Sequence, residues 1–276
     1  MGDAGKLLVI GGAEDPDEEH MRILPCFVEL CGGRNARVVV CGSPSETPIE
    51  KERKYAGLFK KLGVAEVWET HIAERPDAQN EELLERTRNA TGVFFTGGDQ
   101  LRLTSLVAGT HFGDAVLDGL AHHGLIVAGT SAGATAMSTT MVIAGSSEGT
   151  VRRADIELAP GLGYWRDVAV DTHFSQRGRI SRMFTIFAQN PQILGIGIDE
   201  NTAVIVTPGD RFRVVGAGAV YAMDGMVTHS NAADVGDDDI LALTDSLVHV
   251  LPDGYGFDLK KKRPLLPNGE EIAKRS

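Results

Sequence analysis

The sequence predicts an α/β fold: a three-layer sandwich with a mostly parallel sheet and an antiparallel C-terminal extension. Three observations carry this prediction. Short unbroken runs of Val, Ile, Leu and Phe recur in the first half of the chain, as is typical of strands buried on both faces of a parallel sheet. Helical patterns separate these runs, so that strands and helices alternate. Glycine accounts for 33 of the 276 residues, which suits many tight turns between strands and helices.

The alternation can be followed in order along the first 130 residues. Predicted strands occupy residues 7–10, 38–41, 64–68, 92–96 and 125–128. Predicted helices occupy residues 18–31, 48–62, 80–88 and 101–122, the last in one or two pieces. Pro48 stands at the first turn of its predicted helix, where its missing N–H costs nothing. Right-handed crossovers between parallel strands then place helices on both faces of the sheet.

Beyond about residue 194 the pattern changes to short strands separated by frequent turn signals. These strands are expected at residues 194–199, 203–207, 212–215, 220–223, 241–243 and 247–251. No low-complexity linker or internal repeat separates them from the first part of the chain. We therefore expect an antiparallel extension of the same sheet and a single domain over residues 1–276.

Charge and cysteine content narrow the class of protein. Lysine and arginine total 27 and aspartate and glutamate 38, so the formal net charge is −11. A surface that follows nucleic-acid phosphates needs a basic domain, which argues against general nucleic-acid binding. No apolar run approaches the roughly 18 residues of a membrane span, and we expect a soluble, cytoplasmic protein. The three cysteines lack zinc-type spacing and favour buried reduced thiols.

The segment Gly-Thr-Ser-Ala-Gly at residues 129–133 is the strongest single motif. It follows the predicted strand at 125–128 and precedes a helix-compatible stretch of small residues. G-x-S-x-G in this context is the pattern of a nucleophile elbow, which places a reactive serine on a tight turn between strand and helix. Ser131 is therefore the candidate nucleophile. A tight strand-to-helix turn with an incidental serine is the alternative.

A nucleophilic serine needs a base, and the base needs an orienting acid. His173 is the best candidate for the base because it follows the strand-like residues 168–171, and parallel sheets present active groups at strand ends. Candidates for the acid are Glu200, which follows a predicted strand, and Glu148 or Asp155, which lie between the serine and the histidine. We favour Glu200 over Glu148, because Glu148 lies in a Ser-Ser-Glu-Gly loop.

Residues after His173 predict an amphipathic helix whose apolar face consists of Ile180, Met183, Phe184 and Phe187. This register places Arg179 and Arg182 off the buried face, with Arg177 just before the helix. Three guanidinium groups this close to a candidate base are suited to binding a substrate carboxylate. An ordinary solvated helix face is the alternative for the same residues.

Five motifs, in this order and at this spacing, resemble the cyanophycinase family. They are Gly-Gly-Ala-Glu-Asp at 11–15, Thr-Gly-Gly-Asp-Gln at 96–100, Gly-Thr-Ser-Ala-Gly at 129–133, Asp-Thr-His-Phe at 171–174 with Arg177, Arg179 and Arg182, and Asp-Glu-Asn-Thr-Ala at 199–203. The resemblance spans residues 7 to about 225. It implies a serine exopeptidase related to dipeptidase E, with a class I glutamine-amidotransferase-like, flavodoxin-like α/β sandwich. It also implies a homodimer that needs no metal or cofactor.

The family hydrolyses cyanophycin, a poly-aspartate that carries arginine on its side-chain carboxyls, to β-Asp-Arg dipeptides. By this resemblance Ser131 is the nucleophile, His173 the base and Glu200 the orienting acid. The oxyanion hole uses the N–H groups of Ala132 and of the Gly97-Gly98 turn, with Gly98 as the expected donor. The implied substrate-binding residues are Gln100, Asp171, Thr172, Arg177, Arg179 and Arg182.

One position departs from the family pattern, because Thr172 stands where the family usually carries glutamine. On chemical grounds we expect Arg182 to pair with the substrate's carboxylate and Asp171 with its guanidinium. Two other functions stay open. One is a related peptidase that cleaves N-terminal α-aspartyl dipeptides, and the other is a non-catalytic small-molecule binder that uses residues 11–15 and 97–99 as anion-binding loops.

Overall fold

The first half of the chain builds a parallel sheet, as predicted. The computed structural model describes residues 3–145, 150–153, 156–225, 227 and 229–272. The parallel strands are β1 (Lys6–Ile10), β2 (Arg37–Cys41), β3 (Glu66–Glu69), β4 (Gly92–Phe95) and β5 (Ile126–Thr130). They lie in the order β1-β5-β4-β2-β3. All five strands expected from the sequence are therefore present.

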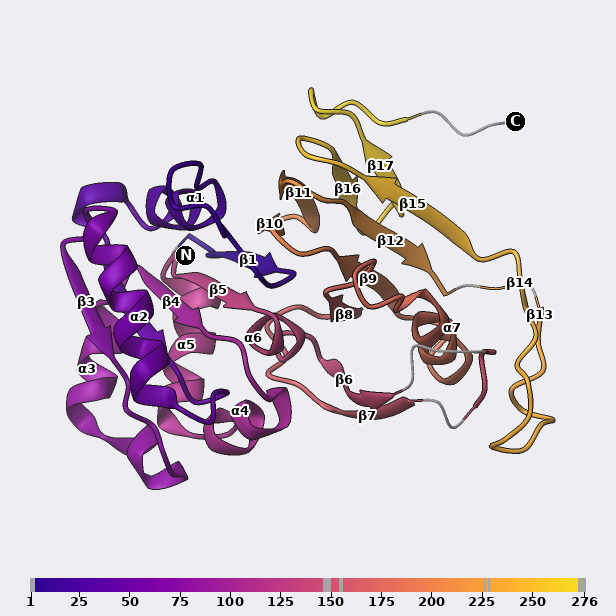
Figure 1. Cartoon of the computed structure of the whole chain (residues 1–276), viewed down its shortest axis with the longest axis horizontal. Coiled ribbons are helices and arrows are strands. Elements are labelled where there is room, and N and C mark those ends of the chain that lie inside the picture. The colour runs from indigo at the N-terminus through magenta and orange to yellow at the C-terminus, as the bar shows by residue number, and fades with distance from the viewer. Residues whose placement is uncertain (1–2, 146–149, 154–155, 226, 228, 273–276) are drawn as a thin grey trace.

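Helices cover both faces of this sheet (Figure 1). They are α1 (Ile23–Leu30), α2 (Pro48–Lys61), α3 (Glu81–Asn89), α4 (Gln100–Val107) and α5 (His111–His122), with the 3-10 turns η1 (Gly33–Asn35) and η2 (Arg75–Gln79). Alternate residues of β1 enter different cores. Leu8 packs in the core that includes α1 and α2, whereas Val9 packs in the core that includes α3, α4 and α5. This alternation explains why the strand is apolar from Leu7 to Ile10.

Two predicted helices have different bounds in the structure. The helix expected at 18–31 begins only at Ile23, because the Asp15 carboxylate accepts hydrogen bonds from the N–H groups of Ile23 and Leu24 and so fixes the start of α1. The helix expected at 101–122 is two helices. Gly109, in the left-handed region at φ +63°, and the capping residue Thr110 divide α4 from α5.

The C-terminal strands divide between two sheets, so the expectation of one continuous sheet is wrong in part. β10 (Thr202–Thr207), β11 (Arg211–Gly216), β16 (Gly256–Asp258) and β17 (Arg263–Leu265) do extend the first sheet, antiparallel, beyond β1. β8 (Val168–Thr172), β9 (Leu194–Ile198), β12 (Val220–Asp224) and β15 (Leu247–Leu251) form a separate four-stranded sheet in the order β15-β12-β9-β8. A single domain over residues 1–276 stays a prediction.

Two glycines allow close packing on β9 of the second sheet. A Cβ on Gly195 would lie 2.4 Å from the Met183 sulfur, and one on Gly197 would lie 2.5 Å from the Phe174 ring. Without side chains of their own, these positions let α7 (Ile180–Gln189) and the turn before it pack directly on β9. The second sheet thus has its own small core.

The remaining elements are short. They are α6 (Ala132–Thr135), the hairpin β6 (Thr140–Gly145) and β7 (Ile156–Pro160), and the pair β13 (His229–Ser230) and β14 (Leu243–Thr244). None of the helices in the described ranges is long and apolar enough to cross a bilayer. Cys31 and Cys41 are buried free thiols, as predicted, and Cys26 is a half-buried one. Burial raises the pKa of the Cys41 thiol to about 11.

Candidate active site

Ser131 lies on the sharp turn between β5 and α6. Its backbone has φ 53° and ψ −114°, a strained conformation for a residue with a side chain. The flanking glycines are required by contact. A Cβ on Gly129 would lie 2.5 Å from the Gly133 carbonyl oxygen, and one on Gly133 would lie 2.6 Å from the Phe95 carbonyl oxygen. The spacing of the G-x-S-x-G motif therefore follows from the crowding of this turn.

The structure brings Ser131, His173 and Glu200 into one hydrogen-bonded chain. Ser131 Oγ lies 2.8 Å from His173 Nε2, and His173 Nδ1 lies 2.6 Å from Glu200 Oε1. With the Nδ1 proton donated to the carboxylate, Nε2 is free to accept the serine proton. The alternative acids Glu148 and Asp155 lie outside the described residues. The arrangement has the chemical order of a serine–histidine–acid triad.

The three groups come from two different sheets. Ser131 follows β5 of the first sheet, whereas His173 and Glu200 follow β8 and β9 of the second. Backbone hydrogen bonds join the sheets at this point, because the N–H of His173 donates to the Gly11 carbonyl at 2.9 Å and that of Asn201 donates to the Gly12 carbonyl at 2.8 Å. The segment after β1 therefore fixes the base and the acid relative to the nucleophile.

Gly12 touches the imidazole ring itself. Its φ is +102°, and a Cβ built on it would lie 2.3 Å from His173 Cε1 and 2.6 Å from Nε2. Any side chain here would displace the base. From the sequence, Gly12 was recognised only as part of the motif at residues 11–15. The signal for its role is the Gly-Gly pair directly after a buried strand.

Two further residues hold the loop that carries Glu200. The buried carboxylate of Asp199 accepts hydrogen bonds from the N–H of Ser175 at 2.9 Å and from the N–H of Ala219 at 3.1 Å. The side-chain amide oxygen of Gln176 accepts from the N–H of Glu200 at 3.1 Å. These contacts tie the loop after β9 to the turn after His173. Neither residue was assigned a role from the sequence.

Two expected oxyanion-hole segments flank the nucleophile. A Cβ on Gly97 would lie 3.4 Å from Ser131 Cβ and 4.0 Å from Ser131 Oγ, so the Gly97-Gly98 turn passes directly beside the serine. Gly98 has φ +149°, and its Cα faces the Pro44 carbonyl so closely that a Cβ would lie 2.1 Å from that oxygen. Ala132 is the first residue of α6, where a backbone N–H has no acceptor within the helix.

Asp171 and Arg182 are paired with each other. Asp171 is 0% exposed and Arg182 only 7% exposed. Arg182 Nε donates to Asp171 Oδ2 at 2.5 Å, and a second bond joins Arg182 Nη2 to Asp171 Oδ1. The expectation that Arg182 lies off the buried face is wrong, because neutralising a fully buried carboxylate requires a cation beside it. In the structure each residue is the other's partner, and the expected pairing with substrate stays a prediction.

The register of α7 differs accordingly from the prediction. Its apolar buried positions include Met183, Ile186 and Phe187, whereas Ile180 is 45% exposed. Arg182 lies beside Met183 on this buried face. The prediction left Arg182 out of the buried face of α7 because arginine was taken to be a surface residue, whereas Arg182 is buried.

The other expected substrate-binding residues are placed as follows. Arg179 Nη1 donates to Asp171 Oδ1 at 2.9 Å and to the Thr172 carbonyl at 2.6 Å. Burial lowers the pKa of the Arg179 guanidinium, against the opposing charge of Asp171. Thr172 is buried at the end of β8, whereas Arg177 is exposed. The Gln100 side-chain amide donates to the Val142 carbonyl at 2.7 Å and so links α4 to β6.

One group of possible metal ligands occurs in the described ranges: Glu52, Glu69 and His71. It lies at the end of β3, three strands from β5 in the sheet order, or about 14 Å at the usual strand spacing. The buried Glu52 carboxylate accepts hydrogen bonds from the Gly42 N–H at 2.9 Å and the Thr70 hydroxyl at 2.7 Å. It thereby ties the ends of β2 and β3 together.

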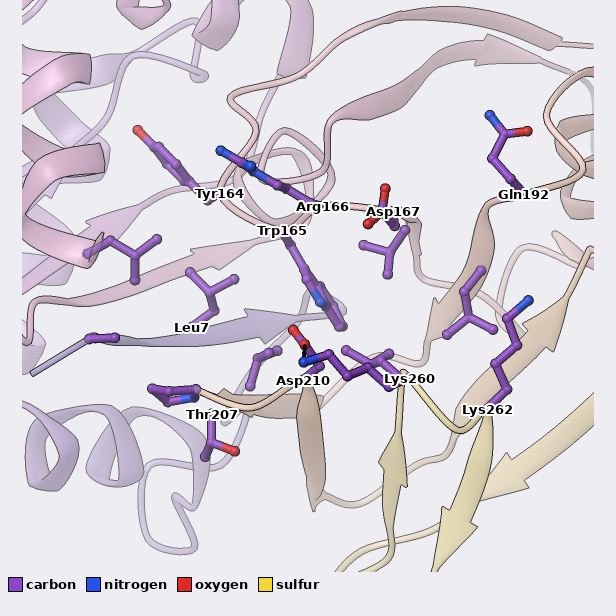
Figure 2. Close-up of a pocket in the computed structure, with 18 residues that line it drawn as sticks. Leu7, Tyr164, Trp165, Arg166, Asp167, Gln192, Thr207, Asp210, Lys260 and Lys262 are labelled. Carbon is purple, nitrogen blue, oxygen red and sulfur yellow. Dashed lines mark ion pairs between the residues drawn. The ribbon is translucent and has the colours of Figure 1, made fainter. Parts of the chain in front are cut away.

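Residues of both sheets line a cavity of about 510 Å³ (Figure 2). It lies by the starts of β1, β8 and β9, whereas Ser131 follows the end of β5. Its lining includes Leu7 near the start of β1, Trp165 before β8, and Lys260. Lys260 forms an ion pair with Asp210 at 2.8 Å. The catalytic constellation belongs to the other edge, where the parallel strands end.

Comparison with known proteins identifies the family to which this constellation belongs. The sequence matches peptidase family S51 over residues 7–215. The chain belongs to peptidase family S51. It is accordingly a serine-type peptidase, and its G-x-S-x-G segment, His173 and Glu200 all lie within the matched residues.

Curated relatives of this S51 peptidase cover most of its length. Cyanophycinase from Synechococcus elongatus is 36% identical over 260 residues, which are 94% of this chain and 80% of the relative. Cyanophycinase from Geminocystis herdmanii is 33% identical and covers 94% and 95% of the two chains. Cyanophycinase from Trichormus variabilis is 35% identical over 269 residues, 97% of this chain and 89% of the relative.

Solved structures confirm the fold class. A peptidase from an acI-B1 Actinobacterium has a TM-score of 0.64 at 23% identity and covers 90% of this chain and 98% of its own. A putative peptidase E protein from Listeria monocytogenes EGD-e has a TM-score of 0.51 at 16% identity, with 78% and 99% covered. At these identities the likeness concerns the fold alone.

Proposed function

We propose that this S51 peptidase is an exopeptidase that degrades cyanophycin and releases β-Asp-Arg dipeptides. The substrate assignment is supported by the likeness to cyanophycinases, which are 33–36% identical over 94–97% of the chain. The single observation that carries the reaction type is the Ser131–His173–Glu200 chain, with its 2.8 Å and 2.6 Å contacts.

In the proposed mechanism, Ser131 Oγ attacks the backbone carbonyl while His173 Nε2 takes its proton. Glu200 holds the imidazole in the required tautomer and stabilises the imidazolium that forms. The imidazolium then protonates the leaving amine, which gives an acyl-enzyme. Water activated by His173 hydrolyses this ester and restores the serine.

The tetrahedral intermediates carry a negative oxygen that needs donors. We assign this role to the backbone N–H groups of Gly98 and Ala132, since the Gly97-Gly98 turn and the start of α6 flank Ser131. Each such donor is typically worth about 3 kcal/mol in the transition state.

For substrate binding we assign Arg177 and Arg179 to the free carboxylates of the polymer. Arg177 is exposed, and Arg179 is held beside His173 by Asp171 and the Thr172 carbonyl. Asp171, which is paired with Arg182, also bonds to Arg179 and so helps to position its guanidinium. Gln100 acts through its bond to β6. Thr172, buried at the end of β8, stands where the family usually carries glutamine.

We also propose that the peptidase is a cytoplasmic homodimer. β15 is an edge strand of the second sheet, and its Leu247, Val248 and Val250 side chains are exposed. Its sequence, Leu-Val-His-Val-Leu, is the same in both directions, so antiparallel pairing about a twofold axis would place Val248 opposite Val250. Sedimentation velocity measures this directly. We expect a dimer that a Val248→Lys, Val250→Lys variant dissociates, and a monomeric parent protein would contradict the proposal.

Digestion of insoluble cyanophycin tests the substrate. We expect the purified protein to dissolve the polymer and to release one dominant product with the mass of β-Asp-Arg, whereas Ser131→Ala releases none. Mass spectrometry of the soluble fraction identifies the product. Cleavage of Asp-Leu with no action on cyanophycin would instead establish the α-aspartyl dipeptidase alternative.

The acid of the triad is tested by Glu200→Gln. This change keeps the shape of the side chain but removes the charge that stabilises the imidazolium, so we expect kcat to fall by about 10²–10⁴-fold. Glu270→Gln is the matched control, because Glu270 is exposed in the C-terminal region. Steady-state kinetics that show equal activity in both variants would remove Glu200 from the mechanism.

A further inference from the structure

The Glu14 carboxylate lies beside the catalytic constellation without a cation of its own. One oxygen, Oε2, accepts a hydrogen bond from the Thr130 hydroxyl at 2.5 Å, and the other, Oε1, accepts one from the Tyr55 hydroxyl. Burial and the adjacent Glu14 charge raise the pKa of Tyr55. No lysine, arginine or histidine of the described ranges forms an ion pair with Glu14. Buried charges in proteins are usually paired, so a half-buried carboxylate whose donors are neutral hydroxyls is suited to a cationic partner.

Glu14 is fixed close to both the nucleophile and the base. Its partner Thr130 directly precedes Ser131 in the chain. Gly12, two residues before Glu14 in the chain, contacts the His173 ring. The Glu14 carboxylate is therefore tied to the strand end that carries Ser131, and its own segment contains the glycine that contacts His173.

The other carboxylates of the site are already occupied. Asp171 is neutralised by Arg179 and Arg182. Both oxygens of Asp199 accept backbone N–H groups, and Glu200 is bonded to His173. Asp171, expected from the sequence to bind a substrate guanidinium, thus lacks the free charge for it. Of Glu14, Asp171, Asp199 and Glu200, Glu14 alone accepts hydrogen bonds only from hydroxyl groups within the described part of the chain.

We propose that Glu14 is a specificity-determining residue that binds a guanidinium group of the substrate. An ionised carboxylate has about four lone-pair sites, and each oxygen of Glu14 uses one of them for a hydroxyl. One site remains on each oxygen, which matches the paired N–H groups of a guanidinium. The inference rests on the proposed function, in which every repeat of the substrate carries an arginine side chain.

A pair of substrates tests this proposal directly. One is a β-Asp-Arg oligomer, and the other carries citrulline, the uncharged isostere of arginine, in its place. We expect the parent protein to prefer the arginine substrate by at least tenfold in kcat/KM, and Glu14→Gln to bring the two values within about twofold. A tenfold preference corresponds to about 1.4 kcal/mol. The loss should arise mainly from a raised KM on the arginine substrate.

Two further variants separate charge recognition from simple positioning. Thr130→Val removes the hydroxyl but keeps the Glu14 charge, so it should slow both substrates alike and leave the preference for arginine intact. Glu19→Gln removes an exposed charge from the same loop and should retain the parent kinetics.

The outcomes distinguish this inference from the function on which it rests. Cleavage of the arginine oligomer with an undiminished preference for arginine in Glu14→Gln would overturn the role of Glu14 alone. Equal losses on both substrates would also overturn it and would show that Glu14 acts only by holding Thr130. Failure of the parent protein to cleave either oligomer would overturn the proposed function itself.

Discussion

The arrangement of the site depends on the contact between the segment after β1 and the turn that carries His173. Ser131 belongs to one sheet and His173 to the other, so the triad exists only where the two sheets meet. The Gly11 carbonyl accepts the His173 N–H at 2.9 Å, and Gly12 leaves room for the ring. Effective proton transfer requires groups within hydrogen-bond reach. The geometry at Gly11-Gly12 therefore decides whether His173 lies within hydrogen-bond reach of Ser131.

A second constraint is the buried ion cluster formed by Asp171 and its two arginines. Asp171, two residues before His173, is fully buried and is held by Arg182 and Arg179. Removing one partner from such a group leaves an uncompensated charge, which typically costs about 3–5 kcal/mol. The ion cluster fixes the end of β8 to α7, so the left-handed turn at His173 starts from a rigid strand. Asp171 and Arg182, both expected from the sequence to bind substrate, thus connect the strand that leads to His173 with α7.

The sequence allowed the parallel half of the fold to be predicted, because unbroken apolar runs and glycine turns are local signals. Ser131, His173 and Glu200 could also be predicted from local signals, because each follows a strand. The second sheet was missed because the pairing of β9 with β8 and β12 joins segments that lie apart in the sequence. The burial of Arg182 and the position of Glu14 likewise follow from partners 11 and 116 residues away. No local pattern encodes them.

The rate at which Ser131 reacts with a fluorophosphonate in Gly12→Ala tests the importance of this contact most directly. The added methyl group would occupy the place of the His173 ring, and misplacing a catalytic group by 1 Å can cost about 10²-fold. Gly63→Ala is the control, because Gly63 has φ +86° but nothing within 4 Å of its Cβ position. We predict a loss of about 100-fold or more in Gly12→Ala and a near-parent rate in Gly63→Ala, with similar melting temperatures for both. A near-parent rate in Gly12→Ala would contradict the account.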